Sequence, residues 1–405
     1  MSGESPLSMM HSAPPRLPKR RPAARRRRLW LFVAPAAIVI VLAVGLTWGW
    51  YLAASIAARA LSGWVDREAK LGRVYACGSQ SIGGFPFRIV TRCNAAAATF
   101  TSNHPPFDLT ATNVTFSAAL YRPTLLHGDI TGPVTLADPG QPPIFVANWS
   151  RAQLDLVGLP SDPEGISVSL IKPRLDRVAG PDSGMIFQAD SADVDGRIVQ
   201  GSARRDPVIE ATGHFTAALA PSFHPLLAAP LQGDIDAVLR GFSDFAPKPW
   251  PVLFREMQAS GGGIDIKSFR IARSDAIVVG AGTLTVNEHG RLDGVLNVAV
   301  AGIENIVPLL GIDQLIGQGI DRLTGAGGGG GGGSSAQGLN ALDRLMPGLS
   351  GVVRDQTNSN LIDNIKKMGQ PTEIDKKPAI ALPLRVADGV IYLGIIPVGV
   401  VPALF

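Results

Sequence analysis

The feature that most constrains this chain is an uncharged apolar run, residues 29–54, directly after a strongly basic tail. A helix of about 20 apolar residues is long enough to cross the hydrocarbon core of a bilayer. Trp30 near the start of the run and Trp48, Trp50 and Tyr51 near its end stand where interfacial aromatic residues are expected. Residues 29–54 are therefore predicted to be a transmembrane anchor. The alternative is a cleaved signal peptide, but the apolar core of such a peptide is only about 7–15 residues long.

The basic tail, residues 1–28, predicts how the anchor is oriented. It contains eight Lys or Arg residues and one acid, a net charge of +7, so the remaining chain carries 4 − 7 = −3. Arg25, Arg26, Arg27 and Arg28 lie immediately before the span, and the positive-inside rule keeps such a run in the cytoplasm. We expect a single-pass inner-membrane protein whose N-terminus is cytoplasmic and whose body is periplasmic. The acidic remainder shows no phosphate-binding footprint, so no nucleic-acid partner is expected.

Cys77 and Cys93 are the only cysteines of the chain, and they bracket two short extended runs around Gly83 and Gly84. A hairpin at these glycines brings the two cysteines within the range that a disulfide needs. An even cysteine pair in an exported compartment favours a disulfide, and the alternative is two free buried thiols. A closed loop of this size adds about 3 kcal/mol of stability in the chain-entropy model.

Residues 74–302 show period-two alternation of apolar residues, for example at Val114, Phe116, Ala118 and Leu120, broken by turns rich in Gly, Pro, Asn and Asp. This pattern predicts a mainly β fold of the α+β class, with an extended, curved antiparallel sheet shaped as a trough or an open barrel. Two similar segments, residues 128–130 and 233–235, each open a strand-like run. They are too short to define a repeat.

Helical spacing predicts three further segments around this body. They are a juxtamembrane helix over residues 55–73, a helix over 303–324 and a helical segment over 339–368. Residues 325–338 form a Gly/Ser-rich linker. Residues 379–405 are predicted to form a closing β-hairpin, because Asp388-Gly389 is a strong turn signal between two alternating runs.

The sequence contains no recognisable active-site motif. The Gly-x-Ser-x-Gly elbow of hydrolases is absent, and the six histidines lack the spacing of a metal site. We therefore predict no catalytic residue, no metal ligand, no cofactor and no enzymatic activity. Asp193 and Asp195 would share one face of a strand, although a turn is the commoner explanation for such a pair. A cleft that gathers His214 or His224 with an acid and a hydroxyl would instead favour an enzyme.

The segment Phe85-Pro86-Phe87 places two aromatic residues beside a proline just after a turn. Proline removes one hydrogen bond from a sheet and is suited to the edge or the start of a strand. We expect the two rings to pack in the core where the sheet begins. The functional alternative is that they form an apolar entrance to a groove.

The order of several short motifs resembles a known bacterial family. After the charged tail, the span and the short helix come residues 84–88 (GFPFR), 121–123 (YRP), 132–134 (GPV), 147–149 (ANW), 290–294 (GRLDG) and 393–399 (LGIIPVG). In this order the chain resembles alphaproteobacterial inner-membrane proteins of the domain-of-unknown-function family 2125. That family carries no assigned activity. More distantly, the chain is similar to AsmA-like envelope proteins, which have one N-terminal span and a long periplasmic sheet curved into a trough.

The AsmA-like resemblance implies lipid handling between membranes. We therefore predict an inner-membrane-anchored periplasmic protein that binds phospholipid or another acyl-chain ligand. The first alternative is a non-catalytic structural or interaction protein with a protein partner in the envelope. The second alternative is a periplasmic hydrolase without a recognisable motif.

Overall fold

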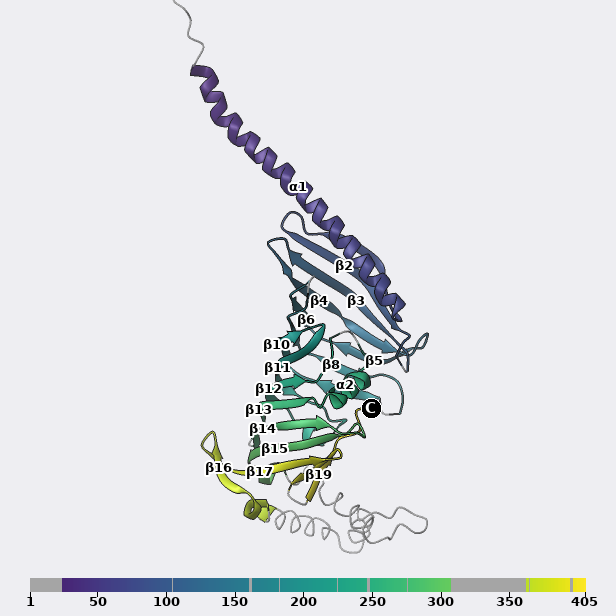
Figure 1. Cartoon of the computed structure of the whole chain (residues 1–405), viewed down its shortest axis with the longest axis vertical. Helices are drawn as coiled ribbons and strands as arrows, with labels where there is room; N and C mark the ends of the chain where they lie inside the picture. The colour runs from purple at the N-terminus through teal and green to yellow at the C-terminus, as the bar shows by residue number, and fades with distance from the viewer. Residues whose placement is uncertain are drawn as a thin grey trace, which may run out of the picture. The chain divides into compact units, whose positions relative to one another are not determined.

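The computed structural model of the chain describes residues 24–306 and 362–405, apart from His104, Pro160, Ser161, Asp182, His224, Ala246, Pro247, Asp275, Asn364, Gly394 and Ile395 (Figure 1). Side chains are not described for residues 24–29, which include Arg25 to Arg28. The predicted linker at 325–338, most of the predicted helix at 303–324 and most of the segment at 339–368 also lie outside the described residues.

The described chain begins with the long helix α1 (Ala24–Lys70), and its other helices are short: η1 (Pro225–Ala228), α2 (Trp250–Ala259) and α3 (Ile303–Ile306). The strands are β1 (Arg73–Gly83), β2 (Arg88–Phe100), β3 (Phe107–Ala119), β4 (Arg122–Ala137), β5 (Pro143–Asn148), β6 (Arg151–Val157), β7 (Gly165–Ile171), β8 (Arg174–Arg177), β9 (Gly184–Gln188), β10 (Ser191–Ser202), β11 (Arg205–Ala218), β12 (Leu231–Arg240), β13 (Gly263–Arg273), β14 (Ala276–Val286), β15 (Leu292–Ala301), β16 (Gln370–Ile374), β17 (Lys377–Ala387), β18 (Val390–Leu393) and β19 (Ile396–Val400).

These strands form a single large antiparallel sheet that is not closed. Its main path runs β1–β2–β3–β4–β6–β7–β10–β11–β12–β13–β14–β15–β17–β18–β19. A branch β5–β8–β9 leaves from β4, and β16 pairs with β17. Figure 1 shows β10 to β15 as successive neighbours. The predicted strand-rich class and the open antiparallel sheet are confirmed.

The chain divides into two units, Met1–Ser55 and Ile56–Phe405. In the first unit, α1 is long and apolar enough to span a membrane. Most of its described apolar side chains are uncovered, as at Phe32 (78% exposed) and Val41 (69%), whereas Trp50 is buried. In the second unit, α1 continues to Lys70, three residues before the predicted end of the juxtamembrane helix at residue 73. Gly72 then turns the chain in the left-handed region, at φ +78°, toward β1.

The sheet in the second unit has one apolar and one polar face, as its cross-strand register shows. Side chains that face each other across antiparallel strands lie on the same side of a sheet. One continuous row on the apolar face consists of Phe116, Gly128, Leu154, Val168, Val194, Gly213, Ile235, Phe269, Gly280, Val298 and Leu382. A second row consists of Ile89, Ala118, Leu126, Leu156, Ile166, Gly196, Ala211, Ala237, Ile266, Gly282, Leu296, Leu384 and Leu393.

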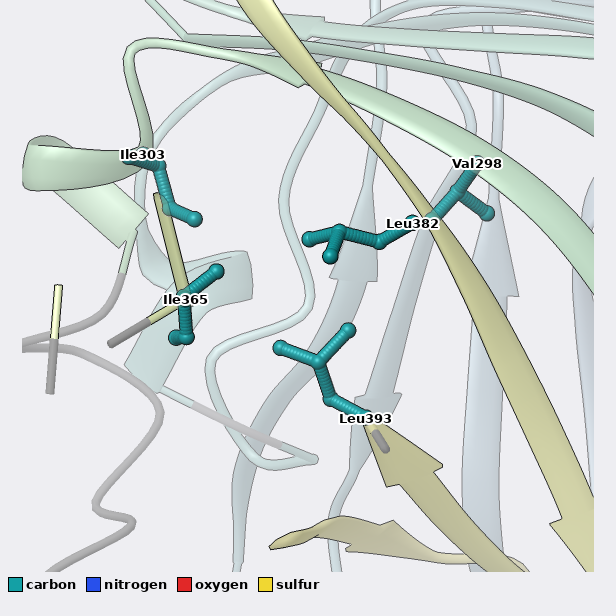
Figure 2. Close-up of a cluster of buried hydrophobic side chains, with 5 residues drawn as sticks. All are labelled: Val298, Ile303, Ile365, Leu382 and Leu393. Carbon is teal, nitrogen blue, oxygen red and sulfur yellow. The ribbon is translucent and has the colours of Figure 1, made fainter. Parts of the chain in front are cut away.

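The apolar face is covered near its C-terminal strands and partly open in the middle. Figure 2 shows Val298, Leu382 and Leu393 from the sheet packed with Ile303 and Ile365. The helix α2 buries Met257 against the neighbouring strands β11 and β14. Between these covers and β4, side chains of the same face remain exposed. They include Ile166 (45%), Val194 (52%) and Ile235 (43%).

The similar segments at 128–130 and 233–235 have a structural counterpart. Gly128 lies opposite Phe116, Gly233 lies opposite Phe215, and Gly280 lies opposite Phe269. At Gly233 a Cβ atom would meet the ring of Phe215 at 2.3 Å, so the phenyl ring occupies the space that a side chain would need. Residues 128–130 lie in the middle of β4 and do not open it as predicted, whereas residues 233–235 begin at the third residue of β12. The glycines allow rings of the adjacent strand to cover the sheet.

Both predicted hairpin turns lie between paired strands, although residues 379–405 contain a third strand, β19, which pairs with β18. β1 and β2 pair around Gly83 and Gly84, and β17 and β18 pair around Asp388 and Gly389. Asp388 (φ 51°) and Gly389 (φ 76°) both adopt the left-handed region that a two-residue type I′ turn requires.

Candidate functional site

An apolar groove of about 900 Å³ lies between the last turns of α1 and the face of β1 to β4. Both walls belong to the unit Ile56–Phe405. The helix wall runs from Ala58 to Asp66. The sheet wall consists mainly of small and apolar side chains, among them Ala96, Leu109, Ala111, Val114, Phe116, Ile130 and Val134. Because Phe116 belongs to the first cross-strand row, the groove occupies the same face that continues as an apolar surface toward β15.

Aromatic side chains fix the helix wall at one end of the groove. The indole of Trp64 stacks on the ring of Tyr75, with centroids 4.8 Å apart. Tyr75 meets Phe100 edge-on at 6.3 Å, and Phe100 stacks on Phe107 at 4.6 Å. These four rings connect α1 to β1, β2 and β3 in succession. Aromatic pairs of this kind add about 0.5–1.5 kcal/mol each beyond the area that they bury.

An ion pair fixes the same end of the helix. Arg73 donates from Nε to the carboxylate of Glu68, and both side chains are about nine-tenths buried. The hydrogen bond to Glu68 raises the pKa of Arg73 above its ordinary value. Burial, followed by the nearby Glu68 charge, raises the pKa of the Tyr75 phenol. Both groups therefore keep their protons at neutral pH, so Arg73 retains its positive charge and Tyr75 remains neutral.

Cys77 and Cys93 lie in the sheet wall of the groove, with their sulfur atoms at disulfide distance and their Cα atoms 5.4 Å apart. The prediction that the first hairpin brings the two cysteines together is confirmed. The link joins β1 to β2, which are the first two strands of that wall. It therefore restrains the spacing of the strands on which the groove is built.

Phe85, Pro86 and Phe87 occupy the turn between β1 and β2. Phe85 is 54% exposed and Phe87 is 59% exposed, so the rings do not pack in the core as expected. Neither ring is among the residues that line the described groove. The reason is that the turn carries the rings beyond the last cross-strand pair, Gly83 with Val90.

The polar face has a hollow of its own, of about 810 Å³, over β10 to β17. Its polar side chains belong to neighbouring strands and include Asp193, Asp195, Thr212, His214, Asp234, Asp236, Lys267, Ser268, Arg270 and Asn297. The two cations of the hollow are paired with acids that do not line it. Arg270 donates to Asp375 at 2.6 Å, and Lys267 pairs with Glu210. The Lys267 ammonium and then Arg197 lower the pKa of the Glu210 carboxyl.

Asp193 and Asp195 lie within β10 and not in a turn, so the commoner explanation for this pair is wrong. They share the polar face. Asp193 accepts a hydrogen bond from Ser169 at 2.6 Å, and Asp195 accepts one from Ser167. Their carboxylates are therefore used in cross-strand hydrogen bonds. Among the described residues, no group of three or more His, Cys, Asp or Glu side chains is arranged to hold a metal ion.

His214 lies in this hollow beside an acid, which is part of the arrangement that would favour an enzyme. Its Nδ1 atom is 2.6 Å from Oδ1 of Asp234, and the two side chains are 40% and 54% exposed. No hydroxyl group of the described residues is hydrogen-bonded to His214. His127 forms a similar cross-strand pair with Asp155 outside the hollow. Both pairs link neighbouring strands. His224 lies outside the described residues.

Sequence reasoning did not identify most of the groove. The alanines at 96–98 and the helix residues 58–66 had no motif to mark them. The one signal that points to it is alternation, which places Val114 and Phe116 on one face of a strand. Which helix covers that face depends on tertiary packing.

Comparison with known proteins adds a family but no activity. A family model described as "Uncharacterized protein conserved in bacteria (DUF2125)" matches residues 50–402. Neither the curated proteins nor the solved structures give a match.

Proposed function

Because the chain belongs to the uncharacterized bacterial family DUF2125, whose description names no activity, we propose a function from the chain's own surface. The protein is anchored by α1 in the inner membrane and binds the acyl chain of a lipid in the groove between α1 and β1–β4. The body is periplasmic, and the protein handles lipid in the cell envelope. The observation that carries this proposal is the groove itself.

Three properties of the groove support an acyl chain as its ligand. Its volume is in the range of about 300–1,000 Å³ that is typical of small-molecule sites. Its sheet wall is built from alanine, valine, leucine, isoleucine and phenylalanine side chains. Polar residues are a minority of the lining, and two of them on the helix wall are charged: Arg59, Ser62, Asp66, Tyr75, Gln80, Thr91 and Thr110. An apolar chain gains about 0.8 kcal/mol for each methylene that it removes from water.

The continuity of the apolar face supports handling as well as binding. The row that contains Phe116 continues through Leu154, Val168 and Val194 to Ile235 without a charged residue. Val194 and Ile235 are half exposed. A bound chain therefore has further apolar surface beyond the groove. The resemblance to AsmA-like proteins supports the proposal that the apolar sheet face handles lipid.

A photoreactive side chain inside the groove tests lipid binding in the cell. We expect benzoylphenylalanine in place of Phe116 to form a covalent lipid adduct in illuminated cells, seen as a mass increase on the purified full-length protein. Benzoylphenylalanine in place of Ser117 is the matched control. Ser117 is the next residue of β3 and pairs with His127 on the polar face. Equal lipid adducts at both positions, or none at position 116, would contradict binding in the groove.

A further inference from the structure

An exposed apolar cluster, separate from the groove, lies at one end of β1 to β4. We call it the aromatic patch, and it consists of Phe85, Phe87, Leu120 and Tyr121. Their exposed fractions are 54%, 59%, 37% and 72%. Phe85 and Phe87 come from the β1–β2 turn, and Leu120 and Tyr121 come from the β3–β4 turn.

The two turns are held side by side by backbone hydrogen bonding. The amide of Leu120 donates to the carbonyl of Phe87 at 2.9 Å. The next residues extend the contact, because Arg88 lies opposite Ala119 and Ala119 lies opposite Arg122. Rings from two separate hairpins therefore form one surface. Soluble proteins rarely leave such clusters exposed unless the cluster binds a partner or a membrane.

The two turns that form the aromatic patch carry positive charge. Arg88 follows Phe87 directly, and Arg122 follows Tyr121 directly. No acidic residue occurs at positions 69–107 or 109–128, the segments that contain both turns. On the neighbouring strand, Asp155 is paired with His127. Exposed rings flanked by arginines match a lipid surface that has an apolar boundary beneath anionic phosphates.

We propose that the aromatic patch inserts into the interface of an anionic phospholipid bilayer, the one that holds the anchor. This inference rests on the proposed membrane anchoring and not on lipid binding in the groove. Chain connectivity favours this bilayer. The body begins directly after the apolar run, because Ala58, the first groove residue, follows that run by only four positions. The bilayer that holds the anchor is therefore the one within reach of the body. Tyrosine and phenylalanine place apolar rings at the interface, and Arg88 and Arg122 contact phosphate. Contact at this end of β1–β4 also places the groove strands at the lipid surface.

Spin labelling of the full-length protein in vesicles tests the proposal. A nitroxide is attached at Tyr121→Cys, with Cys77 and Cys93 left oxidised, in vesicles of phosphatidylcholine and phosphatidylglycerol. The matched control is Phe223→Cys, since Phe223 is 71% exposed in a turn distant in the strand order. We expect the label at 121 to be several-fold more protected from a water-soluble nickel chelate, relative to oxygen, than the label at 223.

The other outcomes have distinct meanings. Equal access of the nickel chelate to both labels overturns the proposal. A second copy of the chain is the partner if the protection at 121 disappears when the protein is diluted in the vesicles and the nitroxide spectrum is broadened by a nearby label. That result also overturns the proposal. Arg122→Gln in the same labelled protein should reduce protection in vesicles that contain phosphatidylglycerol. Filling the groove by Ala111→Trp should leave the label protected. The test of the aromatic patch is therefore independent of whether the groove binds lipid.

Discussion

Replacing Ala111 with tryptophan is expected to remove most of the lipid that purifies with the full-length protein. Ala111 lies opposite Ala96 in the sheet wall, and both residues line the groove. An indole at this position occupies the space that the acyl chain needs. Displacing only two methylenes costs about 1.6 kcal/mol, which is roughly a tenfold loss of affinity. The lipid is measured by mass spectrometry of the native protein against a denatured sample.

The matched control is Thr112→Trp. Thr112 is the next residue of β3, is exposed and is not among the residues that line the groove. The same bulky side chain at that position is expected to leave the lipid content unchanged. If Ala111→Trp retains as much lipid as Thr112→Trp, the lipid is bound elsewhere and the assignment of the groove is wrong.

Removing the link between Cys77 and Cys93 is expected to lower the free energy of unfolding by about 3 kcal/mol, as the chain-entropy model gives for a loop of this length. The two residues are 16 positions apart. The double variant Cys77→Ser, Cys93→Ser should unfold at lower denaturant concentration, with an equal or larger slope because the unlinked denatured chain is more expanded. A reducing agent should lower the unfolding midpoint of the wild-type protein by the same amount and should not change the midpoint of the double variant.

The oxidation state of the same pair also tests the location of the body. A disulfide persists in the periplasm and is rare in the cytoplasm. When cells are lysed in the presence of a thiol-reactive reagent, Cys77 and Cys93 should therefore remain unlabelled until the protein is reduced. Immediate labelling of both cysteines in the unfolded protein would contradict a periplasmic body. A double variant as stable as the wild type would show that the link adds nothing to the fold.

Local patterns in the sequence predicted the parts of the fold that local chemistry determines. The apolar run at 29–54 predicted the first part of α1, and the glycines at 83 and 84 predicted the hairpin that brings Cys77 to Cys93. The Asp388-Gly389 turn lies between β17 and β18 because both residues tolerate positive φ. The alternation of Val114 and Phe116 predicted the strand β3 and the fact that these side chains share a face.

The remaining features depend on contacts between distant parts of the chain. The row from Phe116 to Leu382 follows from the register of many strand pairs, and no single segment encodes it. Gly128 and Gly233 looked like the starts of strands, whereas each accommodates a phenylalanine ring from an adjacent strand. Phe85 and Phe87 are predicted in the core because aromatic residues are usually buried. Their exposure depends on the length of the β1–β2 turn, which the pattern of apolar residues does not give. The groove requires α1 to cover β1–β4, which no motif encodes.

The measurement that tests the central claim most directly is the lipid content of the wild-type protein. The full-length protein is released from detergent in the mass spectrometer and compared with a denatured sample. The proposed function predicts a stoichiometric lipid that stays with the folded protein and leaves on denaturation. A folded protein without lipid that unfolds cooperatively would contradict it and would favour a structural or interaction role in the envelope.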